Sequence, residues 1–231
     1  MKHYSQFCAG LKAGTPIAIG YFAVSFSFGM LAAAAGLSIL DAGLISITNL
    51  TSAGQFAGLS VITSGASLLE MALTQLIINA RYMLMSLSLS QKLDPSISTF
   101  KRALIAFANT DEIFAVAMSN SEPLSASYMF GLASLPIIGW TSGTIIGAAS
   151  RGLLPTSIQS ALGLALYAMF IAVIIPTAKA IKPVRIVVLL SVVVSCLFYY
   201  LPILRDISKG FAIVLCTLIA AGLGAILFPI P

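Results

Sequence analysis

Long apolar segments are the feature that most restricts how this chain can fold. Most are close to about 20 residues in length, which is what an α-helix needs to cross a bilayer. They span residues 13–36, 40–63, 67–90, 100–119, 127–150, 158–178, 186–201 and 211–228. Short polar or charged stretches separate them. The sequence therefore predicts an all-α polytopic membrane protein with about seven to eight transmembrane helices.

Composition supports the same fold class. The chain has 231 residues, of which 59% are hydrophobic and only 8% are charged, whereas a soluble domain is about 25% charged. The net charge of +5 is modest, and the basic residues lie in the polar stretches, as expected for topology signals. The sequence thus predicts one membrane domain, 1–231, with no separate soluble domain and no nucleic-acid partner.

The second apolar segment, 40–63, has an unusual centre. Residues 48–58 are rich in threonine, asparagine, glutamine and glycine. Backbone that unwinds inside a membrane is tolerated only where protein or water surrounds it, and broken helices of this kind form substrate sites in many transporters. A broken or re-entrant segment is therefore expected. A continuous helix that packs through Gly54 and Gly58 is the alternative.

Ionisable side chains gather in two neighbouring segments, 67–90 and 100–119. The first carries Arg81, and the second carries Asp111 and Glu112. The loop between them is short and rich in turn residues, so the two segments should form an antiparallel hairpin. Arg81 lies roughly ten residues, or about 15 Å of helix, before this loop, and Asp111 lies a comparable distance beyond it. We therefore expect Arg81 to meet Asp111 or Glu112 near mid-membrane depth, where a lone charge is costly and often marks a pathway.

The number of membrane crossings and a possible internal duplication are two further features of the organisation. Placing 40–63 as a re-entrant segment puts most basic residues on one side of the membrane, which the positive-inside rule favours over eight crossings. A weak match of residues 34–37 to 150–153 also suggests a duplication with halves 1–122 and 123–231. The polar centre has no clear counterpart in the second half, so a site there would be asymmetric.

Enzymatic chemistry has little support in the sequence. There is no Gly-x-Ser-x-Gly motif, no histidine within an apolar segment and no cluster of metal-ligating residues. The three cysteines, Cys8, Cys196 and Cys216, are scattered without metal or redox spacing. We predict that the protein is not an enzyme and has no metal and no cofactor.

Several short motifs resemble the AzlC/YgaZ family of branched-chain amino acid permeases. Tyr82 is a departure, because a histidine is expected after the arginine of the Asn-x-Arg element. The resemblance covers essentially the whole chain. Its motifs are GLKAGTPIAIGY (10–21), GLS (36–38), AGQFA (53–57), INARY (78–82) and TDEIFA (110–115).

This resemblance implies a secondary transporter that exports valine, leucine, isoleucine or methionine across the bacterial inner membrane. It also implies multi-pass insertion in the lipid bilayer and a small membrane partner of the AzlD/YgaH type. A channel or uniporter for a small polar solute, and a non-transporting membrane scaffold, are the alternatives.

The expected site follows from the chemistry of a zwitterionic substrate. A carboxylate needs donors, an ammonium group needs an acceptor, and the side chain needs apolar surroundings. A carboxylate in low dielectric could also couple proton entry to substrate exit. The alternative is that Arg81 and its carboxylate partner form a structural ion pair. The expected substrate-binding residues are Asn49, Gln55, Phe56, Asn79, Arg81, Asn109 and Asp111, and the expected proton-coupling residues are Asp111 and Glu112.

Overall fold

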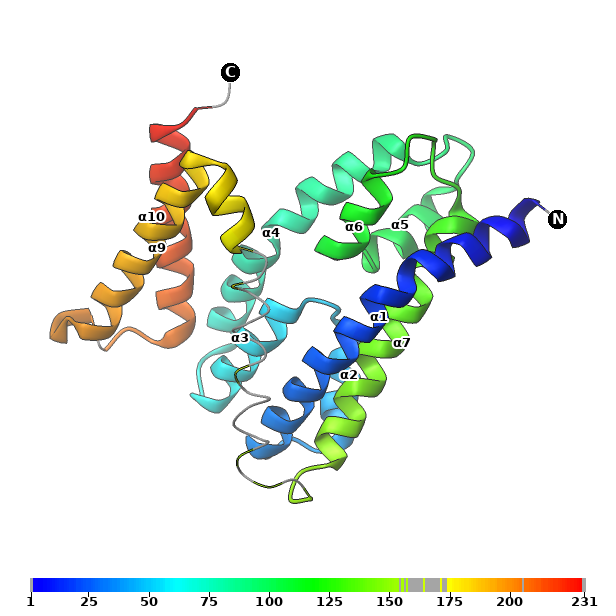
Figure 1. Cartoon of the computed structure of the whole chain (residues 1–231). Helices are drawn as coiled ribbons and strands as arrows, with labels where there is room; N and C mark the ends of the chain where they lie inside the picture. Colours follow the sequence, from blue (N-terminus) through cyan, green and yellow to red (C-terminus); the bar gives the residue numbers. More distant parts are fainter. Residues whose placement is uncertain are drawn as a thin grey trace. The chain divides into compact units, whose positions relative to one another are not determined.

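The computed structural model describes residues 2–153, 155, 157, 164, 171, 174–204 and 206–229. The described part is helical and contains no strand, which confirms the predicted all-α class (Figure 1). The chain divides into two compact units. The first contains Met1–Gln55 and Ala80–Gly163, and the second contains Phe56–Asn79 and Leu164–Pro231. Each unit has its own internal packing.

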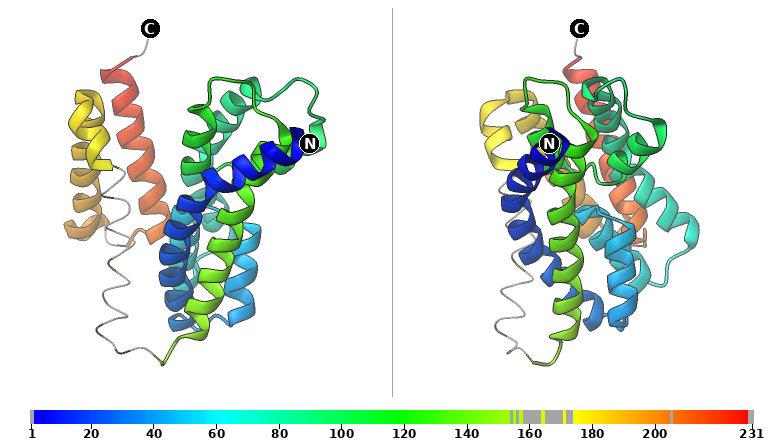
Figure 2. Two further views of the ribbon diagram at one scale, coloured as in Figure 1. Left: turned by 45° about the vertical axis from the view of Figure 1, so that its right-hand side comes forward. Right: turned by 90° about the vertical axis from the view of Figure 1, so that its right-hand side faces the viewer.

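A pair of long helices, α1 (Lys2–Ala34) and α7 (Ala126–Ala149), forms the centre of the first unit. They lie side by side in every view (Figures 1 and 2). Glycines permit this close approach: a Cβ at Gly139 would lie 2.6 Å from the carbonyl oxygen of Ala18. Gly139, Gly143 and Gly147 recur every four residues in the fifth apolar segment, and all three face α1, so they permit close helix packing.

The second apolar segment is broken, as one of the two sequence interpretations predicted. Helix α2 (Ile39–Thr48) ends with Asn49 as its C-cap, and α3 (Ser52–Thr63) begins three residues after that cap. Helix α2 begins with a capping box between Ser38 and Asp41. At the start of α3, the Thr51 hydroxyl accepts a hydrogen bond from the Gly54 amide at 3.1 Å, which satisfies one of the donors that a helix start leaves free.

The segment 100–119, expected to be one helix, is also broken. After α4 (Leu68–Lys92) and a short loop, the chain forms α5 (Thr99–Phe107) and then α6 (Asp111–Met118). The Thr110 hydroxyl caps α6 by accepting from the Ile113 amide. Because threonine is a good N-cap and carboxylates are favourable in the first turn, the Thr-Asp-Glu sequence itself starts a new helix here.

The second unit includes α9 (Lys182–Tyr200), the 3₁₀ turn η1 (Pro202–Leu204) and α10 (Lys209–Leu227). Glu70, at the start of α4, is only 4% exposed. Its Oε1 accepts from the Ser208 hydroxyl at 2.5 Å and from the Gly210 amide at 2.9 Å. A carboxylate from α4 thus caps α10, where the helix dipole favours negative charge.

Four described helices are long and apolar enough to cross a membrane: Tyr4–Ala34, Ala126–Ala149, Lys182–Tyr200 and Lys209–Leu227. They bear out the polytopic membrane class. The expected segment 158–178 lies largely outside the described residues, so the total of seven to eight crossings stays a prediction. The expected repeat halves stay a prediction as well.

Candidate functional site

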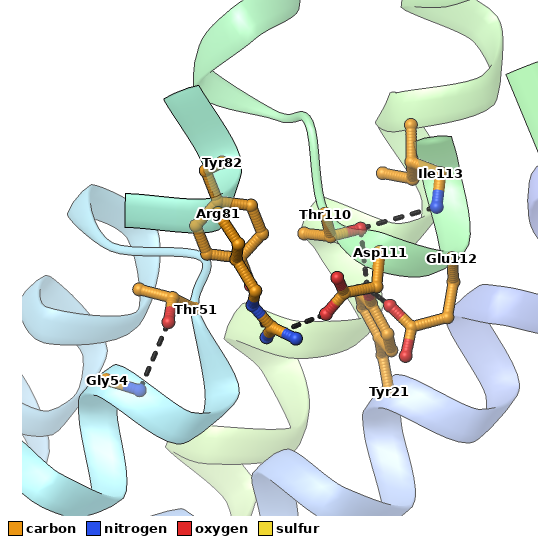
Figure 3. A network of polar contacts seen from close by, with 9 residues as sticks. All are labelled: Tyr21, Thr51, Gly54, Arg81, Tyr82, Thr110, Asp111, Glu112 and Ile113. Carbon is orange, nitrogen blue, oxygen red and sulfur yellow. Dashed lines mark hydrogen bonds and ion pairs between the residues drawn. The ribbon is translucent and has the colours of Figure 1, made fainter. Parts of the chain in front are cut away.

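The predicted hairpin contact forms between α4 and α6 in the first unit. Arg81 Nη2 lies 2.7 Å from Asp111 Oδ2, and it is the only ion pair among the residues that the structure describes. Figure 3 shows the two side chains pointing toward each other across the gap between their helices. The side chains are 46% and 39% exposed, respectively. The pair is therefore accessible from outside the protein rather than sealed within it.

Tyr82 supports Arg81 from the same helix. Arg81 Nη2 lies 3.4 Å from the Tyr82 hydroxyl, and its guanidinium carbon lies 5.0 Å from the centre of the Tyr82 ring. Tyr82 also shares a side-chain hydrogen bond with Thr51, the cap of α3. The tyrosine that replaces the expected histidine thus connects the arginine to the first helix break.

The break between α5 and α6 contains a buried amide. Asn109 is 3% exposed, and its Nδ2 donates to the Ser86 hydroxyl of α4 at 3.1 Å. Its Oδ1 is buried and has no hydrogen-bond partner. Buried polar atoms in native proteins are nearly always satisfied, so an unpartnered acceptor suggests that a ligand or water completes it. This acceptor lies two residues from Asp111.

Glu112 faces away from the arginine and toward α1. Its Oε2 lies 2.5 Å from the hydroxyl of Tyr21, and the same hydroxyl lies 2.6 Å from Thr110 Oγ1. Figure 3 shows the Tyr21 side chain reaching from α1 to both residues. The two acidic residues of α6 therefore have different surroundings: Asp111 faces a cation, and Glu112 faces a phenol.

The break between α2 and α3 is closed by Gln55, which is 2% exposed. Its Nε2 donates to the Asn49 carbonyl and, at 3.3 Å, to the Ile45 carbonyl. Its Oε1 accepts from Trp140 Nε1 at 3.2 Å. The Trp140 ring packs edge-on against Tyr21, with ring centres 5.3 Å apart. Both ends of the glutamine amide are thus bonded to protein.

The expected site residues divide between the two units. Phe56 and Asn79 belong to the second unit, where Asn79 Nδ2 donates to Gln75 Oε1 at 3.1 Å. The first unit holds Asn49, Gln55, Arg81, Asn109, Asp111 and Glu112.

No described group of three histidine, cysteine or acidic side chains could hold a metal ion.

Sequence reasoning missed Tyr21, Trp140 and Ser86, which hold the expected residues in place. The Thr-Asp-Glu sequence could have predicted the second helix break, because it combines a good N-cap with an acidic first turn. No comparable signal identifies Tyr21, since a tyrosine in an apolar helix is usually a packing residue. Its role depends on α1 lying beside α6, which only the fold reveals.

Comparisons with known proteins agree with this architecture. The family model described as AzlC protein matches residues 16–154, which include both helix breaks and the ion pair. The chain is similar to the inner membrane protein YgaZ of Escherichia coli, with 35% identity over 73% of this chain and 71% of that protein. It is also similar to an uncharacterized membrane protein of Archaeoglobus fulgidus, with 32% identity over 76% of this chain and 77% of that protein.

The comparison with solved structures found no match. The extent of the family match and the identity to YgaZ nevertheless agree with each other and with the positions of the shared motifs. The chain belongs to the AzlC family.

Proposed function

We propose that this membrane protein is a secondary transporter that exports valine, leucine, isoleucine, methionine or similar hydrophobic amino acids across the bacterial inner membrane. The observation that carries the proposal is the accessible Arg81–Asp111 pair at a helix break, beside the unpartnered acceptor of Asn109. Membership of the AzlC family supports a role in membrane transport.

The pair suits a zwitterionic substrate because it already holds one charge of each sign. A substrate carboxylate can replace Asp111 as the partner of the Arg81 guanidinium, and a substrate ammonium can replace Arg81 as the partner of Asp111. Asn109 Oδ1 adds a neutral acceptor for the ammonium group. Because each protein charge exchanges one partner for another, neither is left unpaired while the substrate is bound.

A largely apolar cavity near the end of α4 has room for a hydrophobic side chain. A cavity of about 300 Å³ lies between α4 and α5, lined by Ser86 together with apolar residues such as Leu89, Ile105 and Ala106. An apolar cavity of about 150 Å³ is enough to hold benzene. Ser86 lies five residues beyond Arg81, about 7.5 Å along α4, and its hydroxyl accepts from Asn109 Nδ2, so Asn109 connects the cavity lining to the helix break that holds Asp111.

Proton coupling and a small AzlD/YgaH-type partner complete the proposal. The carboxylates of α6 lie in an apolar protein, where a proton can neutralise a carboxylate that has no cationic partner. Proton entry would thus accompany substrate exit. The two lipid-crossing helices of the second unit, α9 and α10, expose many apolar side chains that a membrane partner or lipid could cover.

Efflux of labelled leucine and valine tests the proposal, measured in cells with and without the partner subunit. A hydrogen bond to a charged group contributes about 1.5–3 kcal/mol. Arg81→Ala should therefore lower efflux by about tenfold or more. Arg185→Ala removes an exposed arginine of α9 and is the matched control, with efflux expected to match wild type.

Both variants must reach the membrane in equal amounts for the comparison to hold. Full efflux by Arg81→Ala would overturn the role of the pair. Absence of amino acid efflux from wild type, even with the partner, would overturn the substrate class. Flux that neither saturates nor exchanges with external substrate would favour a channel.

A further inference from the structure

Tyr21 joins α1 to the acidic end of α6. Its hydroxyl lies 2.5 Å from Glu112 Oε2 and 2.6 Å from Thr110 Oγ1, and its side chain is nearly buried. Both distances are short enough for strong hydrogen bonds. A phenol carries one hydrogen, however, and cannot donate to both oxygens at once. One of the two contacts must therefore have Tyr21 as its acceptor.

Two arrangements of hydrogens satisfy this geometry. When Glu112 is ionised it can only accept, so Tyr21 donates to Glu112 and Thr110 donates to Tyr21. When a proton binds Glu112, its new O–H donates to Tyr21, and the Tyr21 O–H turns to donate to Thr110. No proton leaves Tyr21 in either case. The only net change is one proton gained by Glu112, and both hydrogen bonds reverse direction.

We propose that Tyr21 is a positioning residue that transmits the protonation of Glu112 to Thr110, the cap of α6. This inference rests on the proposed function, in which a carboxylate of α6 couples transport to protons. It assigns the proton to Glu112 and leaves Asp111 for the substrate.

The charged surroundings separate the two carboxylates. Asp111 is paired with Arg81 at 2.7 Å, so its charge already has a cation. Glu112 bonds to Tyr21, and no described cation lies within ion-pair distance of it. The titratable groups around the cluster are Tyr21 on α1, Asp111 and Glu112 on α6, and Arg81 and Tyr82 on α4. Of these, Glu112 is the carboxylate that a proton can neutralise without breaking an ion pair.

Thr110 makes this reversal relevant to the binding site. Its Oγ1 accepts from the Ile113 amide at 3.4 Å and so holds the first turn of α6, where Asp111 lies. In the ionised arrangement the Thr110 hydrogen is used by Tyr21. In the protonated arrangement that hydrogen is released at the helix break, one residue from the unpartnered acceptor of Asn109. Protonation of Glu112 thus alters the hydrogen bonding available where the substrate would bind.

Tryptophan fluorescence provides a test that is independent of transport. Trp140 is the only tryptophan of the chain, and its ring contacts the Tyr21 ring edge-on. In purified protein, Trp140 emission should change with pH in wild type as Glu112 titrates. Glu112→Gln should remove this transition. Tyr21→Phe, which keeps the ring but removes the hydroxyl, should remove most of its amplitude, because Glu112 then has no hydrogen bond to the ring that contacts Trp140.

Tyr128→Phe is the matched control. It removes another hydroxyl of the first unit, one that accepts from Asn120 Nδ2 at 3.2 Å, and its titration should match wild type. A wild-type transition that survives in Glu112→Gln or keeps its full amplitude in Tyr21→Phe would overturn the inference, as would a wild-type emission independent of pH. Efflux measured across the same pH range should become flatter in Tyr21→Phe than in wild type. The fluorescence measurement needs no transported substrate. It therefore tests the link between Glu112 and Tyr21 even if the proposed amino acid substrates prove wrong.

Discussion

The two helix breaks of the first unit use the same local device and reach opposite results. Thr51 caps α3 and Thr110 caps α6, and each follows an irregular stretch of a few residues. At the α2–α3 break, Gln55 bonds the Asn49 carbonyl, the Ile45 carbonyl and the Trp140 indole. At the α5–α6 break, a buried acceptor has no partner and an ion pair is accessible.

The difference lies in which groups complete the backbone that each break exposes. Irregular backbone in a membrane must be satisfied by protein, water or ligand. At the α2–α3 break, protein groups supply these partners, so we expect this break to be rigid and to bind no substrate. At the second break some remain to be supplied, so we expect ligand binding there. Stability and transport should therefore respond differently to mutations at the two breaks.

The largest effect on stability is expected from Gln55→Leu. This change leaves the Trp140 indole and the Asn49 carbonyl without their partners, and each unsatisfied buried group costs about 1–3 kcal/mol. We expect the free energy of unfolding to fall by about 3 kcal/mol, measured by thermal unfolding in detergent. Gln91→Leu, at an exposed position near the end of α4, is the control. Equal stability of the two variants would contradict a closed first break.

The next largest loss of stability is expected in the second unit, where Glu70 caps α10. Glu70→Leu removes the cap of α10 and leaves the Ser208 hydroxyl and Gly210 amide without their acceptor. We expect about 2 kcal/mol of destabilisation from the lost cap. Glu70→Gln keeps an acceptor oxygen and should recover much of it. Glu122→Leu changes an exposed glutamate and should have little effect. A stable Glu70→Leu variant would show that the cap contributes little.

Sequence patterns predicted the fold to the extent that each helix is determined locally. Apolar length placed α7, α9 and α10 within four residues at each end, whereas α1 begins at Lys2, eleven residues before the expected start. The polar centre of 40–63 predicted a broken helix. The break at 108–110 was missed because apolar residues on both sides, such as Phe107 and Ile113, conceal it. In that segment capping chemistry determines the structure more than hydropathy does.

The candidate site was predictable where helix geometry alone brings residues together. Arg81 and Asp111 lie at similar distances from one short loop, so their contact follows from an antiparallel hairpin. Tyr21 and Trp140 come from α1 and α7, and their contacts depend on how distant segments pack. Gln55 was expected to bind substrate, yet the structure gives both of its amide groups protein partners. Its assignment to the substrate stays a prediction.

Asn109→Leu should separate stability from transport at the open break. Leucine has a similar size and removes the unpartnered buried acceptor, while the half-exposed Ser86 can bond water after it loses Asn109. The free energy of unfolding should therefore stay within about 1 kcal/mol of wild type or rise. Leucine efflux should nevertheless fall clearly. A variant that loses stability as Gln55→Leu does would indicate that both breaks are structural.

The smallest effect on stability is expected from a mutation in the loop between α4 and α5, which lies outside both helix breaks. The Ser96 hydroxyl and amide donate to Asp94 Oδ1 at 2.7 and 2.8 Å, and these bonds hold the pKa of Asp94 below its usual range. A carboxylate with a lowered pKa stabilises the fold above its unfolded pKa, and this contribution disappears as the pH falls below about 4. Asp94→Asn should thus lower the unfolding temperature slightly at pH 7 and by less at pH 3. Since Asp94 lies outside both breaks, leucine efflux at pH 7 should be unchanged in Asp94→Asn, and a large loss would mean that the hairpin loop controls the open break.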